Sequence, residues 1–301
     1  MKDVEIVDVG PRDGIQSQPK ILDTDTKVEL ITRLVGAGLK RMEVTSFVNP
    51  KRVPQMADAA EVLARLPQHD GVDYIGLILN EKGLDRALGS SVTQVNCAVV
   101  TTDTFCEKNQ GRKADEMLAV TLDMIKRAKD AKMFFGVTIG ATFGCPFEGE
   151  VDPARVAAIA QQLVDVGVDE ISLADTIGVA VPSDVKRVLE AVQKISGDTP
   201  LRMHFHNTRN TGIGNVYASL EMGVRIFDAS CGGVGGCPFA PGATGNVGTE
   251  DVLYLLERAG YKTGIDLQKV IETSSWLSGP LEADMPSMVA RAGTFPKPQA
   301  A

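Results

Sequence analysis

Two of the three histidines in this chain, His204 and His206, stand two residues apart at the end of an apolar run. Side chains of a β-strand alternate between its two faces, so on a strand both imidazoles would point the same way. Two imidazoles on one face of a strand end can bind a single divalent cation. The pattern therefore predicts a metal site, and oxygen ligands from other segments should complete it.

Oxygen ligands for such a cation are available in two other segments. Asp13 follows the first strand-like run, and Asn246 lies in a long loop after the last one. Imidazole, carboxylate and amide ligands together suit Mg²⁺ or Mn²⁺ better than a closed zinc site, and the sequence has no pair of thiolates at ligating spacing. The alternative is that His204 and His206 only form hydrogen bonds inside the protein.

A second group of residues could move protons or stabilise negative charge. Cys237 lies in a glycine-rich loop, and a thiol near a cation and imidazoles can have a depressed pKa. Arg12 could stabilise a developing oxyanion, with Glu43 orienting it, and Asp175 ends another strand-like run. The structural alternatives are a thiol that fills space, a salt bridge at Arg12, a solvated Glu43 and a loop cap at Asp175.

The elements that must position these residues alternate regularly. Strand-like runs occur at 4–9, 40–45, 72–79, 93–100, 133–139, 169–174, 200–206 and 224–229. Stretches with helical periodicity occur at 24–37, 54–66, 81–88, 114–130, 153–166, 182–195, 212–222 and 249–259. Eight such units predict an α/β protein with a (β/α)8 TIM barrel. An open doubly wound sheet is disfavoured because no GxGxxG follows the first strand.

In a barrel of this kind the active site forms where the carboxyl ends of the strands meet, at one rim. The candidate residues named above all follow or end predicted strands, so one rim would gather them. The repeat stops near residue 265. We therefore expect a barrel domain over 1–265 and a short C-terminal extension, a helical segment and tail, over 266–301.

Composition excludes several classes of function. The chain has 301 residues, 44% of them apolar and 23% charged, which predicts a substantial core rather than disorder. A net charge of −8 argues against binding to nucleic acid or to an anionic membrane. The five cysteines form an odd set without CxxC spacing, and the first predicted strand begins close to Met1. We therefore expect a cytoplasmic protein without a signal peptide or membrane span.

Several motifs together closely resemble those of the 3-hydroxy-3-methylglutaryl-CoA lyase family, in the metal-dependent lyase TIM-barrel group. The resemblance covers residues 4 to about 270 and rests on GPRDGIQ at 10–16, EVTSFVNPKRVPQM at 43–56, GCPFEG at 144–149, EISLADTIG at 170–178, HFH at 204–206, GGVGGCPFAPGATGN at 232–246 and TED at 249–251. The glycine-rich loop motif is the most specific of these and points to the acyl-CoA lyase branch.

The resemblance implies a mechanism and a ligand set. Mg²⁺ or Mn²⁺ would be held by Asp13, His204, His206 and Asn246, and would chelate the substrate. Retro-Claisen cleavage of 3-hydroxy-3-methylglutaryl-CoA would then give acetyl-CoA and acetoacetate. Arg12 would stabilise the thioester enolate, and Cys237 would take part in proton transfer.

Coenzyme A, as part of the substrate, needs its own contacts. Asn49 and Lys51, in the cluster 49–52, and Asn80, near the end of the third strand, are the candidates, although a Lys-Arg pair is more often simply solvated. By analogy with barrels of this group we expect a homodimer.

The chain departs from the family pattern after HFH, where Asn207 stands in place of an aspartate and Arg209 adds a cation. Neither change removes a predicted ligand. The acyl group nevertheless stays open, with citramalyl-CoA, methylmalyl-CoA and a longer-branched hydroxyglutaryl-CoA as alternatives. A non-catalytic CoA-binding barrel is the alternative from a different class.

Overall fold

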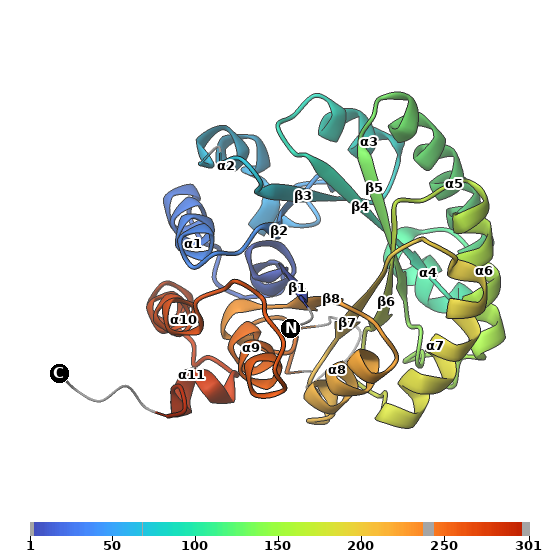
Figure 1. Cartoon of the computed structure of the whole chain (residues 1–301). Helices are drawn as coiled ribbons and strands as arrows, with labels where there is room; N and C mark the ends of the chain where they lie inside the picture. The colour runs from blue at the N-terminus through green and yellow to red at the C-terminus, as the bar shows by residue number, and fades with distance from the viewer. Residues whose placement is uncertain (1–2, 68, 237–243, 297–301) are drawn as a thin grey trace.

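The computed structural model describes residues 3–67, 69–236 and 244–296, and in them eight parallel strands close into a barrel. Each strand pairs with the next along the chain, and the last pairs with the first (Figure 1). The predicted (β/α)8 barrel is confirmed. The strands are β1 (Glu5–Asp8), β2 (Arg41–Ser46), β3 (Asp73–Ile78), β4 (Gln94–Val100), β5 (Phe134–Gly140), β6 (Glu170–Asp175), β7 (Leu201–Phe205) and β8 (Ile226–Ala229).

Helices surround the barrel in chain order (Figure 1). The stretch predicted at 54–66 divides into a 3-10 turn, η2 (Pro54–Met56), and the helix α2 (Ala59–Arg65). The other predicted helices are α1 (Thr24–Gly36), α3 (Glu81–Leu88), α5 (Ala114–Asp130), α6 (Pro153–Asp165), α7 (Pro182–Ser196), α8 (Gly212–Glu221) and α9 (Thr249–Arg258). Sequence analysis did not predict η1 (Gly10–Gly14), α4 (Asp103–Gln110) or η3 (Cys231–Gly233).

Strand β7 has one apolar face and one polar face. On β7, Met203 and Phe205 are buried in the apolar core that the strands form with the helices. The alternate residues, Arg202 and His204, point into the barrel, as the two-residue period of a strand requires. Because the same alternation recurs in neighbouring strands, charged and amide side chains occupy much of the barrel interior.

The ends of the helices follow their sequence signals. The side chains of Asp23 and Asp152 accept hydrogen bonds from the first turns of α1 and α6. Gly167 and Gly260 follow α6 and α9 with φ angles of +75° and +81°, which a residue with a side chain rarely adopts. These stops return the chain to the next strand or, after α9, to the C-terminal segment.

Beyond the barrel, α10 (Leu267–Leu281) and α11 (Met288–Ala292) follow α9. Helix α10 contacts α1, α9 and η3, and lies beside α1 and α9 in Figure 1. The backbone amide of Ser287 donates to the carbonyl of Gly232 at 3.0 Å, so the C-terminal segment braces the start of the glycine-rich loop. The domain boundary at residue 265 stays a prediction. None of the helices in the described ranges is long and apolar enough to cross a membrane.

Candidate active site

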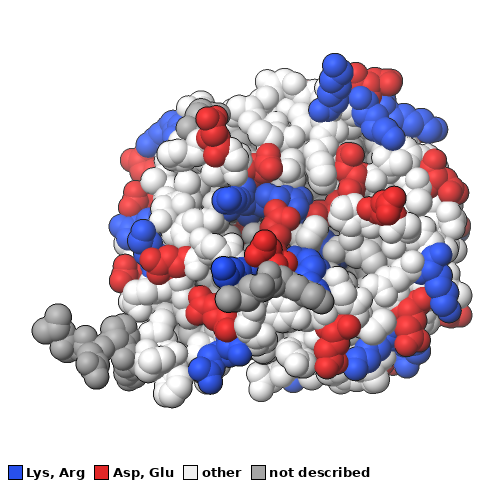
Figure 2. All heavy atoms as spheres, viewed as in Figure 1, with Lys and Arg blue, Asp and Glu red and all other residues white. Residues whose placement is uncertain are grey.

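A cavity of about 1060 Å³ opens at the carboxyl ends of the strands. In Figure 2, acidic and basic side chains are visible together in the middle of the face shown. The volume matches that of small-molecule sites, which span roughly 300–1,000 Å³. The polar side chains that line the cavity include Arg12, Asp13, Gln16, Glu43, Arg52, Asn96, Thr138, Thr176, His204, His206 and Asp228.

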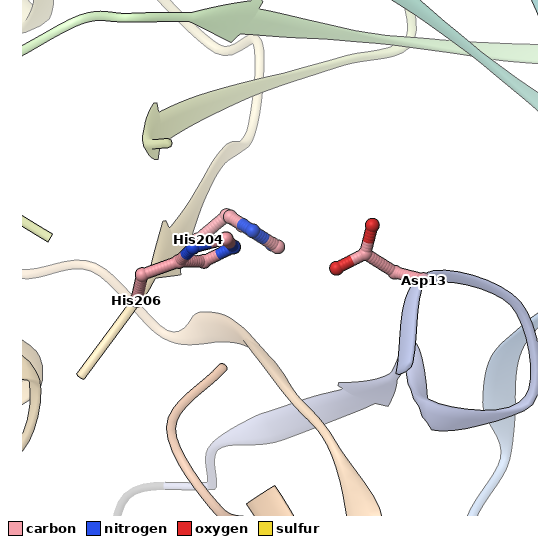
Figure 3. Close-up of side chains that lie close together, drawn as sticks. All are labelled: Asp13, His204 and His206. Carbon is pink, nitrogen blue, oxygen red and sulfur yellow. The ribbon is translucent and has the colours of Figure 1, made fainter. Parts of the chain in front are cut away.

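Three of the predicted metal ligands converge in this cavity. Asp13, in η1 directly after β1, reaches toward His204 and His206 at the end of β7 (Figure 3). One potential ligand atom from each residue lies within 4.8 Å of the others. The fourth predicted ligand, Asn246, forms a backbone bridge with His206, and its Nδ2 donates to Asp13 Oδ2 at 2.8 Å. The structure therefore brings all four residues together.

Unpartnered polar atoms test whether this group fits a cation. Asn246 Oδ1 and His206 Nδ1 are buried, and neither has a hydrogen-bond partner among the described residues. Buried polar atoms are nearly always paired, so such atoms in one cluster indicate that a ligand is needed there. Imidazole nitrogens with carboxylate and amide oxygens form a donor set that suits a divalent cation. The residues present thus fit the metal that the resemblance implied.

The charges of these ligands are set by their neighbours. Burial opposes ionisation of Asp13, but Arg12, the two imidazoles and the Asn246 amide together lower the pKa of its carboxyl to about 2. Burial, together with the charge of His204, lowers the pKa of His206 to about 4. Burial also opposes charge on His204, yet Asp228 raises the pKa of that imidazole above its ordinary value. Both an ionised carboxylate and a neutral His206 are suited to ligation.

Arg12 is held on two sides. Its Nε contacts Glu43 Oε1, and its Nη1 donates to Asp13 Oδ1 at 2.9 Å. Glu43 is 1% exposed, and its second carboxylate oxygen accepts from Asn96 Nδ2 at 3.4 Å. Burial raises the pKa of Glu43 and outweighs the opposing charge of Arg12. Glu43 is therefore placed to orient the guanidinium beside the predicted metal ligands.

Asp175, the remaining described residue among the catalytic candidates, is bonded to its own loop. Its two carboxylate oxygens accept from the backbone amides of Val179 and Ala180, each at 3.0 Å. Asp175 is not among the residues that line the cavity, although its neighbour Thr176 is. This geometry matches the loop-cap alternative. Cys237 lies outside the described residues.

The candidates for coenzyme A contact have local partners as well. Asn80 Oδ1 accepts from the Gly83 amide at 2.9 Å as the N-cap of α3, and Asn49 Oδ1 accepts from the Lys51 amide at 2.9 Å. None of these three candidates is among the residues that line the cavity, whereas Arg52 is. Arg52 is exposed, and it forms no ion pair among the described residues.

The two departures from the family pattern brace nearby loops. Arg209 Nη1 donates to the carbonyls of Ile177 and Gly178, at 3.1 and 2.9 Å. Asn207 Oδ1 accepts from the Gly212 amide at 3.1 Å, at the start of α8. Both residues therefore stabilise backbone around the rim and leave the four predicted ligands in place.

The sequence did not mark Asp228 or Asn96 as site residues. Asp228 Oδ2 lies 3.1 Å from His204 Nδ1, and Asn96 contacts Glu43. Asp228 is a lone polar residue in the strand Ile226–Ala229, and Asn96 stands between apolar residues in the strand Gln94–Val100, so a polar residue among apolar ones was the available signal. Arg52 belongs to the 49–52 cluster that was expected to contact phosphate, and it is the member of that cluster named here that lines the cavity.

Comparisons with known proteins agree with the geometry. An (R)-citramalyl-CoA lyase from Chloroflexus aurantiacus is 42% identical, covering 97% of this chain and 96% of that protein. The mitochondrial hydroxymethylglutaryl-CoA lyase of Macaca fascicularis is 40% identical, covering 97% and 90%. A solved structure of an HMG-CoA lyase from Acinetobacter baumannii, in complex with coenzyme A and 3-methylmalate, is 38% identical with a TM-score of 0.93, covering 99% and 98%. The family model described as HMGL-like matches residues 3–277, and the chain belongs to this HMGL-like family.

Proposed function

We propose that this protein is a divalent-metal-dependent carbon–carbon lyase that cleaves a 3-hydroxyacyl-CoA thioester by a retro-Claisen reaction. The observation that carries the proposal is the convergence of Asp13, His204 and His206 in the cavity, with unpartnered atoms on His206 and Asn246. The first candidate substrate is 3-hydroxy-3-methylglutaryl-CoA, which would yield acetyl-CoA and acetoacetate. Membership of the HMGL-like family supports this chemistry.

A second candidate substrate is citramalyl-CoA, which would yield acetyl-CoA and pyruvate. The observation that favours it is the 42% identity to the citramalyl-CoA lyase, close to the 40% identity to a hydroxymethylglutaryl-CoA lyase. The two substrates share the hydroxyl, the neighbouring methyl group and the thioester, and they differ by one methylene before the carboxylate. A single methylene changes binding in a pocket by about 1–3 kcal/mol, so either substrate is compatible with the same catalytic groups.

The described residues divide the chemistry between them. A divalent cation held by Asp13, His204, His206 and Asn246 would supply a Lewis acid that lowers the pKa of the substrate hydroxyl. Arg12, beside Asp13, is placed to stabilise the negative charge that develops on the thioester oxygen as the bond breaks. Glu43 keeps that guanidinium in place from a buried position. Cys237 is proposed to give its thiol proton to the carbon of the enolate, which forms acetyl-CoA.

The anionic groups of coenzyme A need a cation at the cavity. Arg52 is suited to this role because it lines the cavity and makes no ion pair with the described residues. An arginine fork binds phosphate oxygens with two parallel hydrogen bonds. We therefore propose Arg52 for the phosphate contact, while Asn49, Lys51 and Asn80 remain candidates from the sequence.

Metal identity, assembly and location complete the proposal. We propose Mg²⁺ or Mn²⁺ as the cation because oxygen ligands match the two imidazoles in number. We propose a homodimer by analogy with other barrels of this group. The described cysteines, Cys97, Cys106, Cys145 and Cys231, are all free, which supports a reducing compartment such as the cytoplasm.

An acyl-CoA panel tests the proposed function. Purified protein is incubated with 3-hydroxy-3-methylglutaryl-CoA, citramalyl-CoA and methylmalyl-CoA, with Mg²⁺ or with EDTA, and release of acetyl-CoA, or of propionyl-CoA from methylmalyl-CoA, is followed. We expect turnover of one of the first two, loss of turnover in EDTA and its return with excess Mg²⁺. The variant His206→Ala should lose at least about 1,000-fold in kcat, because several kcal/mol of stabilisation come from a bound metal. Turnover that EDTA leaves unchanged would contradict the mechanism, and no turnover of any thioester would favour a binding protein.

A further inference from the structure

The two imidazoles of the candidate metal centre differ in what holds them. His204 Nδ1 lies 3.1 Å from Asp228 Oδ2, a carboxylate on the neighbouring strand β8. His206 Nδ1, by contrast, is buried without a hydrogen-bond partner among the described residues. The ring centroids are 5.2 Å apart, so the two side chains share one environment and differ mainly in this contact. Asp228 therefore acts on one ligand of the pair.

The carboxylate of Asp228 also forms an ion pair with a buried arginine. Arg202, two residues before His204 on β7, places its Nε 3.4 Å from Asp228 Oδ1. Arg202 is 1% exposed, and its Nη1 also pairs with Glu170 Oε1 at 3.2 Å. Arg202 and Asp228 therefore form a buried ion pair, in which removal of either partner would leave the other charge uncompensated. Asp228 thus joins a buried cation on one side to an imidazole on the other.

A carboxylate beside one imidazole nitrogen decides which nitrogen carries the proton. An ionised carboxylate only accepts hydrogen bonds, so His204 must present Nδ1–H to Asp228. Its Nε2 is then left with a free lone pair, which is the atom that binds metal in carboxylate–histidine–metal arrangements. Arg202 and His204 are two residues apart on β7 and point to the same face, so the strand places both side chains beside Asp228.

We propose that Asp228, anchored by Arg202, is a positioning residue that holds His204 in the Nδ1–H tautomer and so strengthens binding of the divalent cation. The inference rests on the proposed function, because it assigns a role within the same metal centre. It makes a specific distinction between two carboxylates of the barrel interior. Asp228 and Glu170 both pair with Arg202, but only Asp228 contacts His204.

Glu170 therefore provides the matched control. Asp228→Asn and Glu170→Gln each replace one carboxylate of Arg202 by an amide of the same shape. An amide at position 228 can also donate to His204 Nδ1, and this would move the ring proton to Nε2 and block ligation. Asp to Asn changes beside a histidine act in this way in serine proteases. The change at Glu170 leaves the contact of His204 intact.

The test uses the whole chain after removal of metal with a chelator. Affinity for Mn²⁺ is measured from the paramagnetic resonance signal of free Mn²⁺, and the tautomer of His204 is read from long-range ¹H–¹⁵N spectra of the Mg²⁺-loaded protein, which contains only three histidines. We expect Asp228→Asn to raise the dissociation constant for Mn²⁺ by about 10- to 100-fold and to change the tautomer. We expect Glu170→Gln to change that constant less than about threefold while lowering the melting temperature, as loss of a buried charge partner does.

The outcomes separate this inference from the proposed function. Equal Mn²⁺ affinity in wild type and Asp228→Asn, or an equal loss in both variants, would overturn the positioning role. A wild-type protein that binds Mn²⁺ but cleaves no thioester would contradict the proposed function and leave the role of Asp228 standing. If wild type binds no Mn²⁺, both fail. If Asp228→Asn does not fold, the double variant Arg202→Gln with Asp228→Asn takes its place, because it also removes the charge that Asp228→Asn leaves unpaired. Arg202→Gln alone is then the reference in the same measurements.

Discussion

The barrel interior contains two groups of polar side chains that differ in how completely they pair. The lower group, formed by Arg41, Gln94, Glu170 and Arg202, lies near the amino ends of the strands, where Arg41 donates to both carboxylate oxygens of Glu170 at 2.9 and 3.1 Å. Arg41 also donates to Gln94 Oε1 at 2.9 Å. The upper group is the candidate active site, in which atoms of His206 and Asn246 have no partner among the described residues.

The difference separates structural from functional polarity. A buried charge is stable only when paired, and the lower group meets this requirement mostly with its own members and their neighbours. The exception is Arg202 Nε, which has no hydrogen bond but lies 3.4 Å from Asp228 Oδ1 in an ion pair. The upper group leaves ligand atoms unpaired at the mouth of a cavity, and it therefore needs something from outside the chain. Residue types alone do not reveal this difference, because both groups contain arginine, carboxylate and amide side chains. Predictions about each group follow from it.

Arg12 offers the sharpest test of the upper group. We expect Arg12→Lys to lower kcat by about 100- to 1,000-fold with little change in KM, because the lost interaction forms mainly as charge develops. Lysine keeps the charge but lacks the fork that contacts both Glu43 and Asp13. Steady-state kinetics with the thioester substrate measures kcat and KM separately. Recovery of most activity by lysine would show that charge alone, rather than the held geometry, is required.

Arg41 tests the lower group. We expect Arg41→Met to lower the free energy of unfolding by about 3 kcal/mol, because Glu170 would lose its bidentate partner inside the barrel. Affinity for Mn²⁺ and kcat should stay within about threefold of wild type, since Arg41 touches none of the proposed ligands. Denaturant unfolding together with a metal titration checks both parts. A large loss of metal affinity would mean that the two groups are coupled rather than distinct.

The fold was predictable because its signals are local and repeat eight times. The strands carry apolar runs or alternate apolar with polar residues, and most helices carry an apolar stripe. The elements that sequence analysis missed lack these patterns. Helix α4 contains few apolar residues, with only Phe105 and Cys106 buried, so no stripe marks it. The turn η1 consists of five residues, GPRDG, which are too short to show a period.

The site was predictable where a residue type is rare and its strand end is clear. The four predicted metal ligands were named in this way, because histidines are few and the carboxyl ends of all barrel strands share one rim. The sequence does not show which side chains already form hydrogen bonds with nearby backbone. Asn80 therefore appears available for a ligand, although its side chain caps α3. Nor does it show that a lone acid in a short strand, Asp228, faces an imidazole. These distinctions depend on contacts between strands that are far apart in the chain.

Arg52 and Lys51 extend the comparison to the rim. The two cations are adjacent, but only Arg52 lines the cavity. We expect Arg52→Gln to raise KM for the thioester by about tenfold with kcat unchanged, as loss of one charge-assisted hydrogen bond would do. Lys51→Gln removes the same charge and should leave KM within about twofold, apart from an effect that salt screens. Equal effects of the two variants would point to the overall field rather than to a specific contact.

KM measured with a truncated substrate shows which part of the thioester Arg52 binds. The effect of Arg52→Gln should disappear with a thioester of pantetheine, which lacks the nucleotide phosphates, if the contact is to coenzyme A. If the same tenfold effect persists with that truncated substrate, the arginine instead meets the carboxylate of the acyl group. The second result would assign Arg52 to substrate choice between the two candidate acyl-CoAs.

Glu250 provides the most distant test, because it is a buried carboxyl outside the barrel interior. Whereas Glu170 pairs with arginines, the carboxylate of Glu250 accepts from the backbone amide of Gly232, at 2.9 and 3.1 Å. Burial raises the pKa of Glu250 from 4.5 to about 7. The folded protein therefore holds a proton that the unfolded chain releases between these values. The contribution of Glu250 to the free energy of unfolding is greatest below pH 4.5, falls as the pH rises from 4.5 to about 7 and is constant above that.

Glu250→Gln should remove this pH dependence, because the amide stays neutral at every pH. Between pH 5 and pH 8 the free energy of unfolding of the variant should therefore increase by about 1–3 kcal/mol relative to that of wild type, so that the variant gains relative stability as the pH rises. Asp8→Asn is the internal comparison. Burial raises the pKa of Asp8 to about 6, so its effect should have the same sign and end nearer pH 6. Urea unfolding at several pH values measures both, and a variant of Glu250 that follows wild type across the range would mean that this carboxyl is ionised and compensated, as the charges of the lower group are.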